Sequence, residues 1–242
     1  NRRVAMRRAV RIARAGIVIH LAGLAQGGAD PRRLEAMIRT NTDATRHLLD
    51  EALAGGRLRR FVFTGTSSEY GAAPIPFRES QRLRPTTPYG VSKAGASLYC
   101  LAAAVTAGAP VVILRPSLIY GPGQVGENFL PSLIRAVVRG ESFRMSRGLQ
   151  RRDFLFVDDA AAGIVRAAIR PVPPGTVMNL ASGREVRLRD LAKRIIRMVG
   201  KGRLDLGAVT PSRGDPERVV MDTRLARRLL GWRPRVSLET GL

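Results

Sequence analysis

Tyr89 and Lys93 are the two residues of this 242-residue chain whose types and spacing most directly predict chemistry. They lie four positions apart at the start of a predicted helix, so their side chains share one helical face. A free tyrosine has a pKa of roughly 10 and is a poor base at neutral pH, but a nearby ammonium favours its phenolate. The pair therefore predicts a tyrosine that takes a proton from an alcohol or returns one to a ketone. An exposed helix pair without chemistry is the alternative.

The elements around the pair alternate short apolar runs with longer segments of helical period, a pattern typical of a parallel sheet covered by helices. The expected strands are 17–21, 61–63, 111–114, 154–157 and 177–180, and the expected helices are 1–15, 31–53, 88–105 and 158–169. Ligands of open parallel sheets bind outside the carboxyl ends of the strands. Residues 22–23, 64–68 and 115–120 follow three of these strands, so a site is expected among them.

A cluster of hydroxyl side chains in 64–68 follows the second expected strand. From this place the hydroxyl of Thr66 could bond both a substrate oxygen and Tyr89. Such clusters are more often plain loops, and only the combination with the helix start at Pro88 makes this one a candidate for catalysis.

Taken together, Thr64–Ser68 and the segment Pro88-Tyr89-Gly90-Val91-Ser92-Lys93 resemble the extended short-chain dehydrogenase/reductases, in particular the NAD-dependent epimerase/dehydratase branch that acts on sugar nucleotides. Further segments match the family in order: 20–23, Asn41, 70–71, 115–122, 127–131, 151–159, 214–215, Asp222, 230–232 and Pro234. The resemblance implies an α/β fold, a Rossmann-like parallel sheet with a small C-terminal substrate-binding cap. It assigns 1–122 and 153–183 to a partial NAD(P)-binding Rossmann domain, and 123–152 and 184–242 to the cap.

The resemblance also implies a mechanism of reversible hydride transfer through a keto sugar. Tyr89 would remove the hydroxyl proton, Thr66 would orient the reacting oxygen, and Lys93 would lower the tyrosine pKa and bond the nicotinamide ribose. A cofactor, NAD or NADP with NAD preferred, is expected on Leu21, Ala22, Gly23, Asn41, Tyr89, Lys93 and Pro116. A nucleotide-diphosphate sugar is expected on Ser67, Asn128, Arg152 and Arg213, with Arg152 at the diphosphate; Arg213 is one position off the usual family spacing.

The largest departure from the family concerns its glycine-rich loop, which places a helix N-terminus against the cofactor pyrophosphate. Gly23, Gly27 and Gly28 have the wrong spacing and follow the wrong strand. The first βαβ unit is therefore expected to be missing, with the chain clipped at both ends and a sheet edge left unpaired. We expect the 242-residue chain alone to bind NAD poorly or not at all. Micromolar binding in a calorimetric titration of the purified chain would contradict this expectation.

Two smaller departures bear on the reaction. Dehydratases of the family carry an acidic pair directly after the catalytic threonine, whereas this chain has Ser67 and Ser68 there and Glu69 one position late. Dehydration is therefore disfavoured. Leu118 stands where many members have an asparagine, so the nucleotide is not predicted. The leading hypothesis is a 4-epimerase, and the alternative is a 4-keto-sugar-nucleotide reductase.

The composition sets limits on other functions. The formal net charge is +22, but 38 of the 41 basic residues are arginines, and these are dispersed without interleaved aromatic residues for base stacking. No nucleic-acid partner is expected, although a non-catalytic RNA-binding or nucleotide-binding member of the fold remains a second alternative. No apolar run approaches the length of about eighteen residues that suggests a membrane span. The chain has one cysteine, which favours a location in the reducing cytoplasm, and it has no Cys/His cluster, so no metal site is expected. A homodimer is possible.

Overall fold

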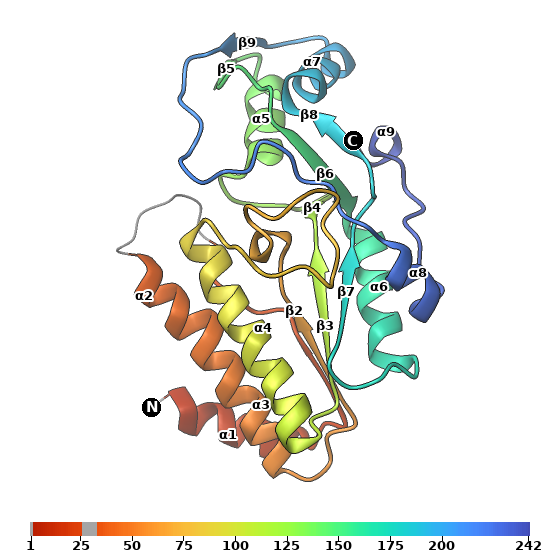
Figure 1. Cartoon of the computed structure of the whole chain (residues 1–242). Helices are drawn as coiled ribbons and strands as arrows, with labels where there is room; N and C mark the ends of the chain where they lie inside the picture. Colours follow the sequence, from red (N-terminus) through yellow and green to blue (C-terminus); the bar gives the residue numbers. More distant parts are fainter. Residues whose placement is uncertain (1, 26–32) are drawn as a thin grey trace.

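The computed structural model of the protein describes residues 2–25 and 33–242. Its main sheet contains β1 (Ile17–His20), β2 (Arg60–Thr64), β3 (Val111–Pro116) and β7 (Thr176–Leu180), in that spatial order and all parallel. The strands are rich in β-branched and aromatic residues, and β3 is buried along its whole length, as expected for a parallel strand covered on both faces. The predicted α/β class is confirmed (Figure 1).

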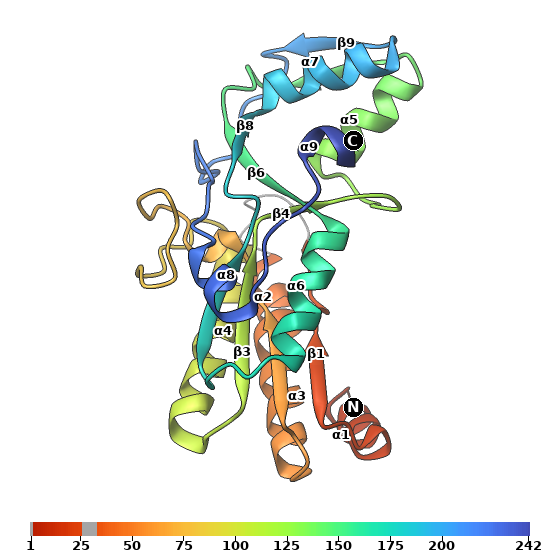
Figure 2. The same cartoon turned by 90° about the vertical axis from the view of Figure 1, so that its right-hand side faces the viewer.

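Helices cover both faces of this sheet (Figures 1 and 2). One face packs against α3 (Ala44–Ala54) and α4 (Pro88–Ala107), with Phe61 and Phe63 of β2 in the shared core. The other face packs against α6 (Val157–Ile169) and α8 (Arg224–Leu230), where Val62 of β2 is buried. Successive residues of β2 thus point to opposite faces, as strand geometry requires.

The chain before α3 forms one continuous helical stretch with a change of winding. It begins with α2 (Leu34–Met37) and passes through the π-helical turn η2 (Ile38–Asp43) into α3. Such π-helical turns often lie at functional sites. In this stretch the described part of the expected helix 31–53 is helical, and residues 31–32 lie outside the described part.

A second region lies above the carboxyl ends of the main sheet (Figure 2). It has a sheet of β4 (Leu118–Tyr120), β6 (Arg151–Phe156) and β8 (Glu185–Arg187), and a parallel pair, β5 (Ser142–Met145) and β9 (Arg203–Leu206). Helices α5 (Phe129–Val138), α7 (Leu188–Val199) and α9 (Leu238–Gly241) accompany these strands. Leu133 and Leu191 lie at the centre of its core.

The packing divides the chain differently from the expected ranges in two places. The strand expected at 154–157 runs from Arg151 to Phe156 and pairs with β4 and β8, whereas β7 is the strand beside β3. The stretch 224–232 was assigned to the cap, yet its side chains pack on the main sheet. Leu230 and Trp232 join Leu180 in that core, and Trp232 donates a hydrogen bond of 2.9 Å to the Asp159 carbonyl.

Among the described strands, β1 has a neighbour on one side only. Ile17 and Ile19 are 37% and 40% exposed, and Leu21, directly after the strand, is 58% exposed. Helix α1 (Arg2–Ala13) packs on α3, where Arg7 forms an ion pair of 2.9 Å with Glu51, and it leaves this edge open. The described residues thus present an unpaired, partly apolar sheet edge.

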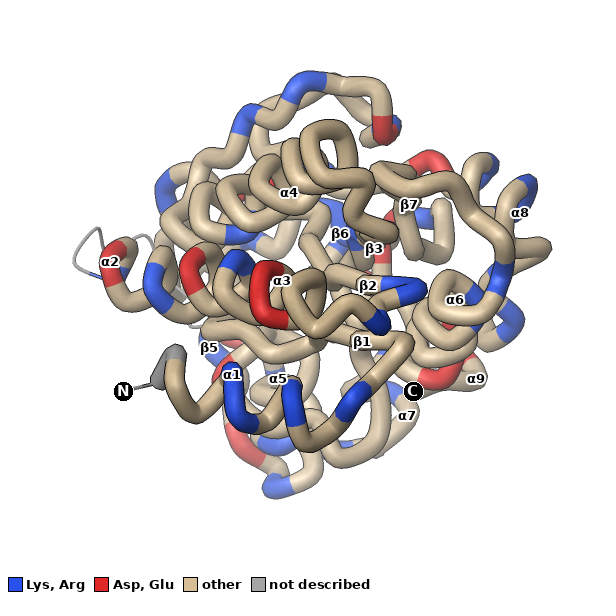
Figure 3. Tube along the Cα trace, turned by 90° about the horizontal axis from the view of Figure 1, so that it is seen from below, with Lys and Arg blue, Asp and Glu red and all other residues tan. Residues whose placement is uncertain are grey.

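Basic residues are spread over the underside of the molecule rather than gathered on one element (Figure 3). Blue positions appear on α1, at β2 and on α8, with acidic residues among them. In residues 2–25 and 33–242, no helix combines the length and the apolar character that crossing a lipid bilayer requires.

Candidate active site

A cleft of about 640 Å³ opens at the carboxyl ends of β1, β2 and β3, where open parallel sheets bind ligands. Most of the residues expected to act on cofactor or substrate line it. Those lining residues are Leu21, Gly23, Thr66, Ser67, Tyr89, Lys93, Pro116, Asn128 and Arg213. Three of the expected residues, Ala22, Asn41 and Arg152, do not line this cleft.

Thr66 and Tyr89 meet in the cleft because two helix starts converge there. Thr66 is the N-cap of a short 3₁₀ helix, η3 (Ser67–Glu69), and its Oγ1 accepts a hydrogen bond of 3.2 Å from the Ser68 amide. Thr87 caps α4 in the same way, because its hydroxyl accepts a hydrogen bond of 3.1 Å from the Gly90 amide. Pro88 occupies the first position of this helix. Both side chains line the cleft, and Thr66 lies near enough to the Tyr89 phenol to favour its phenolate.

Gly90 allows this convergence. A Cβ atom at this position would lie 2.5 Å from the Ser68 carbonyl oxygen, which is closer than any real side chain tolerates. Only glycine therefore lets the first turn of α4 approach η3 closely enough for Tyr89 to reach Thr66.

The Lys93 ammonium is buried at the base of the cleft, with its side chain 4% exposed. Its Nζ lies 4.4 Å from the centroid of the Phe63 ring, a cation–π arrangement. Burial lowers the pKa of Lys93 to about 8, and the nearby Glu69 carboxylate opposes this shift. The ammonium is therefore held without an ion-pair partner of its own in the described residues.

Tyr89 corrects one expectation. Burial raises the pKa of Tyr89, the charge of Glu69 adds to the rise, and only the nearby Thr66 side chain opposes it. The lowered phenol pKa expected from Lys93 is not found, because desolvation of the phenolate dominates and the ammonium lies over Phe63. In this structure the nearby Lys93 thus does not offset the effect of burial on the Tyr89 phenol.

Asn41 lies behind the cleft and fixes the backbone that forms its wall. Its Oδ1 accepts a hydrogen bond of 2.7 Å from the Leu24 amide. Its Nδ2 donates hydrogen bonds of 3.1 Å to the Leu24 carbonyl and 2.9 Å to Ser92 Oγ. It therefore ties the loop after β1 to the helix that carries Tyr89 and Lys93. The π-helical turn η2 places Asn41 for these contacts.

Arg152 lies in a small recess of about 110 Å³ that shares Ser67, Ser68, Thr87, Leu118 and Asp215 with the main cleft. Its guanidinium forms an ion pair of 2.6 Å with Asp215, the one carboxylate among the residues lining the recess. Asp215 belongs to the segment 207–217, which also contributes Arg213 to the cleft. Thr86 Oγ1 anchors this segment with a bond of 2.6 Å to the Gly214 carbonyl.

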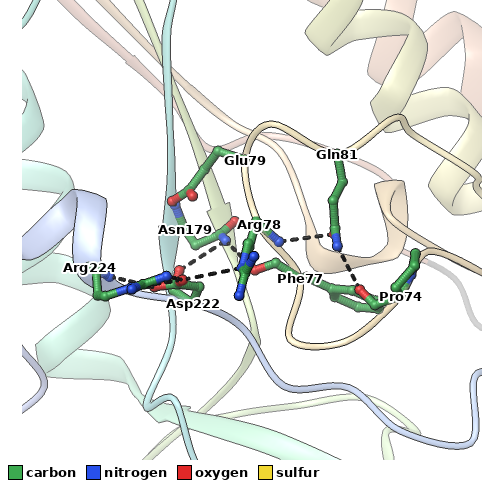
Figure 4. Close-up of polar contacts among 8 residues, drawn as sticks. All are labelled: Pro74, Phe77, Arg78, Glu79, Gln81, Asn179, Asp222 and Arg224. Carbon is green, nitrogen blue, oxygen red and sulfur yellow. Dashed lines mark hydrogen bonds and ion pairs between the residues drawn. The ribbon is translucent and has the colours of Figure 1, made fainter.

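The loop between η3 and α4 is held against β7 by a polar network (Figure 4). Glu79 Oε1 accepts a hydrogen bond of 2.9 Å from the backbone amide of Asn179. The side-chain Nδ2 of Asn179 donates hydrogen bonds of 3.0 and 3.1 Å to the carbonyls of Phe77 and Asp222. The Asp222 carboxylate in turn binds Arg224 at 2.6 Å and Arg78 at 3.7 Å. This network fixes the loop that leads into the catalytic helix.

Several lining residues were not among those expected. Thr87 could have been found from its sequence, because a threonine directly before Pro88 is a helix-start signal. Asp215 was recognised only as part of a closing pattern, and nothing in the sequence showed that it binds Arg152. Thr64 and Ser68 line the cleft as part of the hydroxyl cluster.

A model of the NAD dependent epimerase/dehydratase family matches residues 1–181. The chain belongs to this family. Among curated relatives, a dTDP-glucose 4,6-dehydratase of Streptomyces griseus is 33% identical over 229 residues, which cover 93% of this chain and 69% of that protein.

Solved structures of the epimerase/dehydratase family superpose closely on this chain. MoeE5 in complex with UDP-glucuronic acid and NAD has a TM-score of 0.89 at 30% identity, over 96% of this chain and 78% of that one. A UDP-glucose 4-epimerase of Thermotoga maritima with UDP-glucose has a TM-score of 0.90 at 26% identity, over 99% of this chain and 78% of that one. Both dehydratases and epimerases are thus represented among its relatives.

Proposed function

We propose that this protein is an NAD-dependent sugar-nucleotide 4-epimerase, which oxidises a sugar hydroxyl to a ketone and reduces it again from the other face. The observation that carries the proposal is the pair of hydroxyls of Thr66 and Tyr89, which line one cleft together with Lys93. A dehydratase would need acidic side chains beside this pair, whereas Ser67 and Ser68 occupy those places.

The residues present fit a nicotinamide cofactor on the β1 side of the cleft. Thr64 Oγ1 is buried, lines the cleft and has no hydrogen-bond partner among the described residues, so a polar group is free to meet it. Gly23 leaves the backbone bare beside Lys93, since a Cβ there would lie 3.8 Å from Nζ. NAD, with which MoeE5 was solved, would supply the hydride acceptor and donor.

The chain's own residues would bind, orient and move protons. Tyr89 takes the proton of the sugar hydroxyl and returns it to the ketone oxygen, and Thr66 holds that oxygen by its hydroxyl. Lys93 supplies positive charge at the base of the cleft. On the substrate side Arg152 would neutralise the diphosphate by charge-assisted hydrogen bonds, displacing Asp215, with Asn128, Arg213 and Ser67 along the cleft wall.

The Glu69 carboxylate does not restore the missing acidic pair. Its two oxygens accept hydrogen bonds from the Thr66 amide and from Arg115, and its side chain is fully buried outside the cleft. Elimination of water from the sugar needs an acid or base at the carbons beside the ketone. This placement supports epimerisation over the dehydration performed by the Streptomyces griseus relative.

Product analysis of the whole gene product tests the proposal. Incubated with UDP-glucose and with dTDP-glucose, an epimerase converts the sugar to its C4 epimer without net change in the absorbance of reduced nicotinamide. Formation of a 4-keto-6-deoxy sugar would show a dehydratase and contradict the proposal.

The alternative functions give different results in the same assay. A 4-keto-sugar-nucleotide reductase consumes reduced nicotinamide stoichiometrically when offered a 4-keto-6-deoxy sugar nucleotide. A binding protein would show no turnover, and salt-sensitive RNA binding would favour that reading. We place the protein in the reducing cytoplasm, and sedimentation of the active protein would establish whether it forms a homodimer.

A further inference from the structure

We propose that Glu69, through its buried ion pair with Arg115, is a positioning residue for the reaction: it holds Thr66 in place and its charge acts on both Tyr89 and Lys93. This inference rests on the proposed function, because it concerns the same cleft. It adds a residue that touches neither cofactor nor substrate.

The geometry places the Glu69 carboxylate directly behind the catalytic loop. Its Oε1 accepts a bond of 2.9 Å from the Thr66 amide, and its Oε2 accepts one of 2.8 Å from Arg115 Nε. The side chains of Glu69 and Arg115 are buried, at 0% and 3% exposed. Gly65 provides the necessary space, because a Cβ there would collide with Glu69 Oε1. The backbone of Thr66 is therefore set by this carboxylate.

Arg115 ties the carboxylate to the rigid sheet. Arg115 lies near the end of β3. Its NH1 group donates a hydrogen bond of 3.1 Å to the Tyr70 hydroxyl, and that hydroxyl donates one of 2.7 Å to Asn179 Oδ1 on β7. Its guanidinium also lies 4.8 Å from the centroid of the Tyr70 ring. These contacts connect the sheet through Arg115 and Glu69 to Thr66. The sheet therefore restrains the position of Thr66.

The charge of Glu69 reaches both proton-handling groups. It raises the pKa of Tyr89, and it raises the pKa of Lys93 against the lowering caused by burial. Lys93 also faces His20 on β1, whose pKa burial and that lysine lower to about 4, and the Cys100 thiol on α4, whose pKa burial raises to about 12. Burial raises the pKa of Glu69 itself, and the guanidinium of Arg115, which faces it from β3, opposes that rise. Neutral Thr66 lies beside Tyr89. Glu69 is thus the negative group that acts on both Tyr89 and Lys93.

Stability alone does not account for this pair. A buried ion pair is weak evidence for stability, because apolar replacements of similar volume are often as stable. A neutral glutamine could still accept the Thr66 amide through its carbonyl oxygen. What a glutamine cannot supply is the negative charge at this place.

Glu69→Gln tests the proposal in the whole gene product, with Glu79→Gln as the matched control. Glu79 is a carboxylate in the same polar network that bonds the Asn179 amide but does not contact Thr66. For Glu69→Gln we expect kcat to fall about tenfold with KM little changed, because the glutamine NH2 group cannot accept the bond from Arg115 and Thr66 shifts slightly. Without the charge Tyr89 and Lys93 both lose protons more easily, so the pH profile of kcat/KM moves to lower pH. Glu79→Gln should leave the profile in place.

A second measurement separates failure of this inference from failure of the proposed function. The phenolate absorbance of the protein minus that of Tyr89→Phe gives the titration of Tyr89 without any turnover. If the wild type converts no sugar nucleotide, the function is wrong, and this titration still decides the inference. An unchanged Tyr89 titration in Glu69→Gln, or an unshifted pH profile with wild-type kcat, overturns it.

If Glu69→Gln does not fold, Glu69→Asp takes its place. The aspartate keeps the charge but shortens the reach to the Thr66 amide. The proposal then expects a lower kcat with an unshifted pH profile. Wild-type kcat in Glu69→Asp would overturn it.

Discussion

Replacing Tyr89 with phenylalanine is expected to lower kcat about a thousandfold, within the range by which a positioned acid or base accelerates proton transfer. The substitution keeps the aromatic ring and removes only the phenol hydroxyl of this cleft-lining residue. Since that hydroxyl is the group in the cleft that can exchange a proton with the sugar oxygen, KM should change little. Steady-state kinetics of the whole gene product, with circular dichroism to check the fold, measure the effect.

Tyr99→Phe is the control for this substitution. Tyr99 lies on the same helix, but its hydroxyl bonds Asp50 on α3 and is not among the residues lining the cleft. Its removal should leave kcat unchanged. If Tyr89→Phe retained more than about a tenth of the activity, Tyr89 would not be the general acid and base.

Lys93→Met is expected to abolish turnover and yet make the fold more stable. Burial lowers the pKa of Lys93 to about 8 from the ordinary value of 10.5. Holding this ammonium charge at neutral pH therefore makes the folded protein less stable relative to the unfolded chain. At about 1.4 kcal/mol per pKa unit, the buried charge lowers the free energy of unfolding by roughly 3 kcal/mol at most. A methionine of similar length fills the place over Phe63 without a charge.

Urea unfolding of the 242-residue chain measures this gain and its pH dependence. The folded pKa is depressed, so between about pH 8 and pH 10.5 the unfolded chain binds the proton that the folded chain has released. Wild-type stability therefore rises with pH across this window relative to Lys93→Met, and the advantage of the variant shrinks. Lys193→Met, at an exposed position of α7, should change neither quantity. A variant less stable than the wild type at neutral pH would contradict the expectation.

The features that the sequence predicts correctly depend on local patterns. Tyr89 and Lys93 share a helical face because they are four residues apart, and Thr66 follows a strand whose apolar residues mark it as buried. Parallel strands bring their carboxyl ends to one edge, so three segments distant in the chain line one cleft. These rules suffice for the α/β class and for the place of the cleft.

The remaining features depend on contacts between distant residues, which leave no local pattern. Glu69 and Arg115 are 46 positions apart, and Asn41 and Ser92 are 51 apart. Strand β6 pairs with β4 rather than with the main sheet, where β7 is the neighbour of β3. The raised pKa of Tyr89 likewise follows from the partial burial of the phenol in the folded chain, which the spacing from Lys93 does not reveal.

The distribution of lysines has a practical consequence for surface measurements. Lys93 is buried, while Lys193 and Lys201 are exposed on α7 and directly after it, at the end of the molecule farthest from α1 and the base of the sheet. Besides the terminal α-amino group, an amine-reactive biosensor chip or dye therefore meets only these two side chains in the otherwise arginine-rich surface. The molecules that couple through these two side chains would share one orientation, with α1 and the base of the sheet turned to the solution.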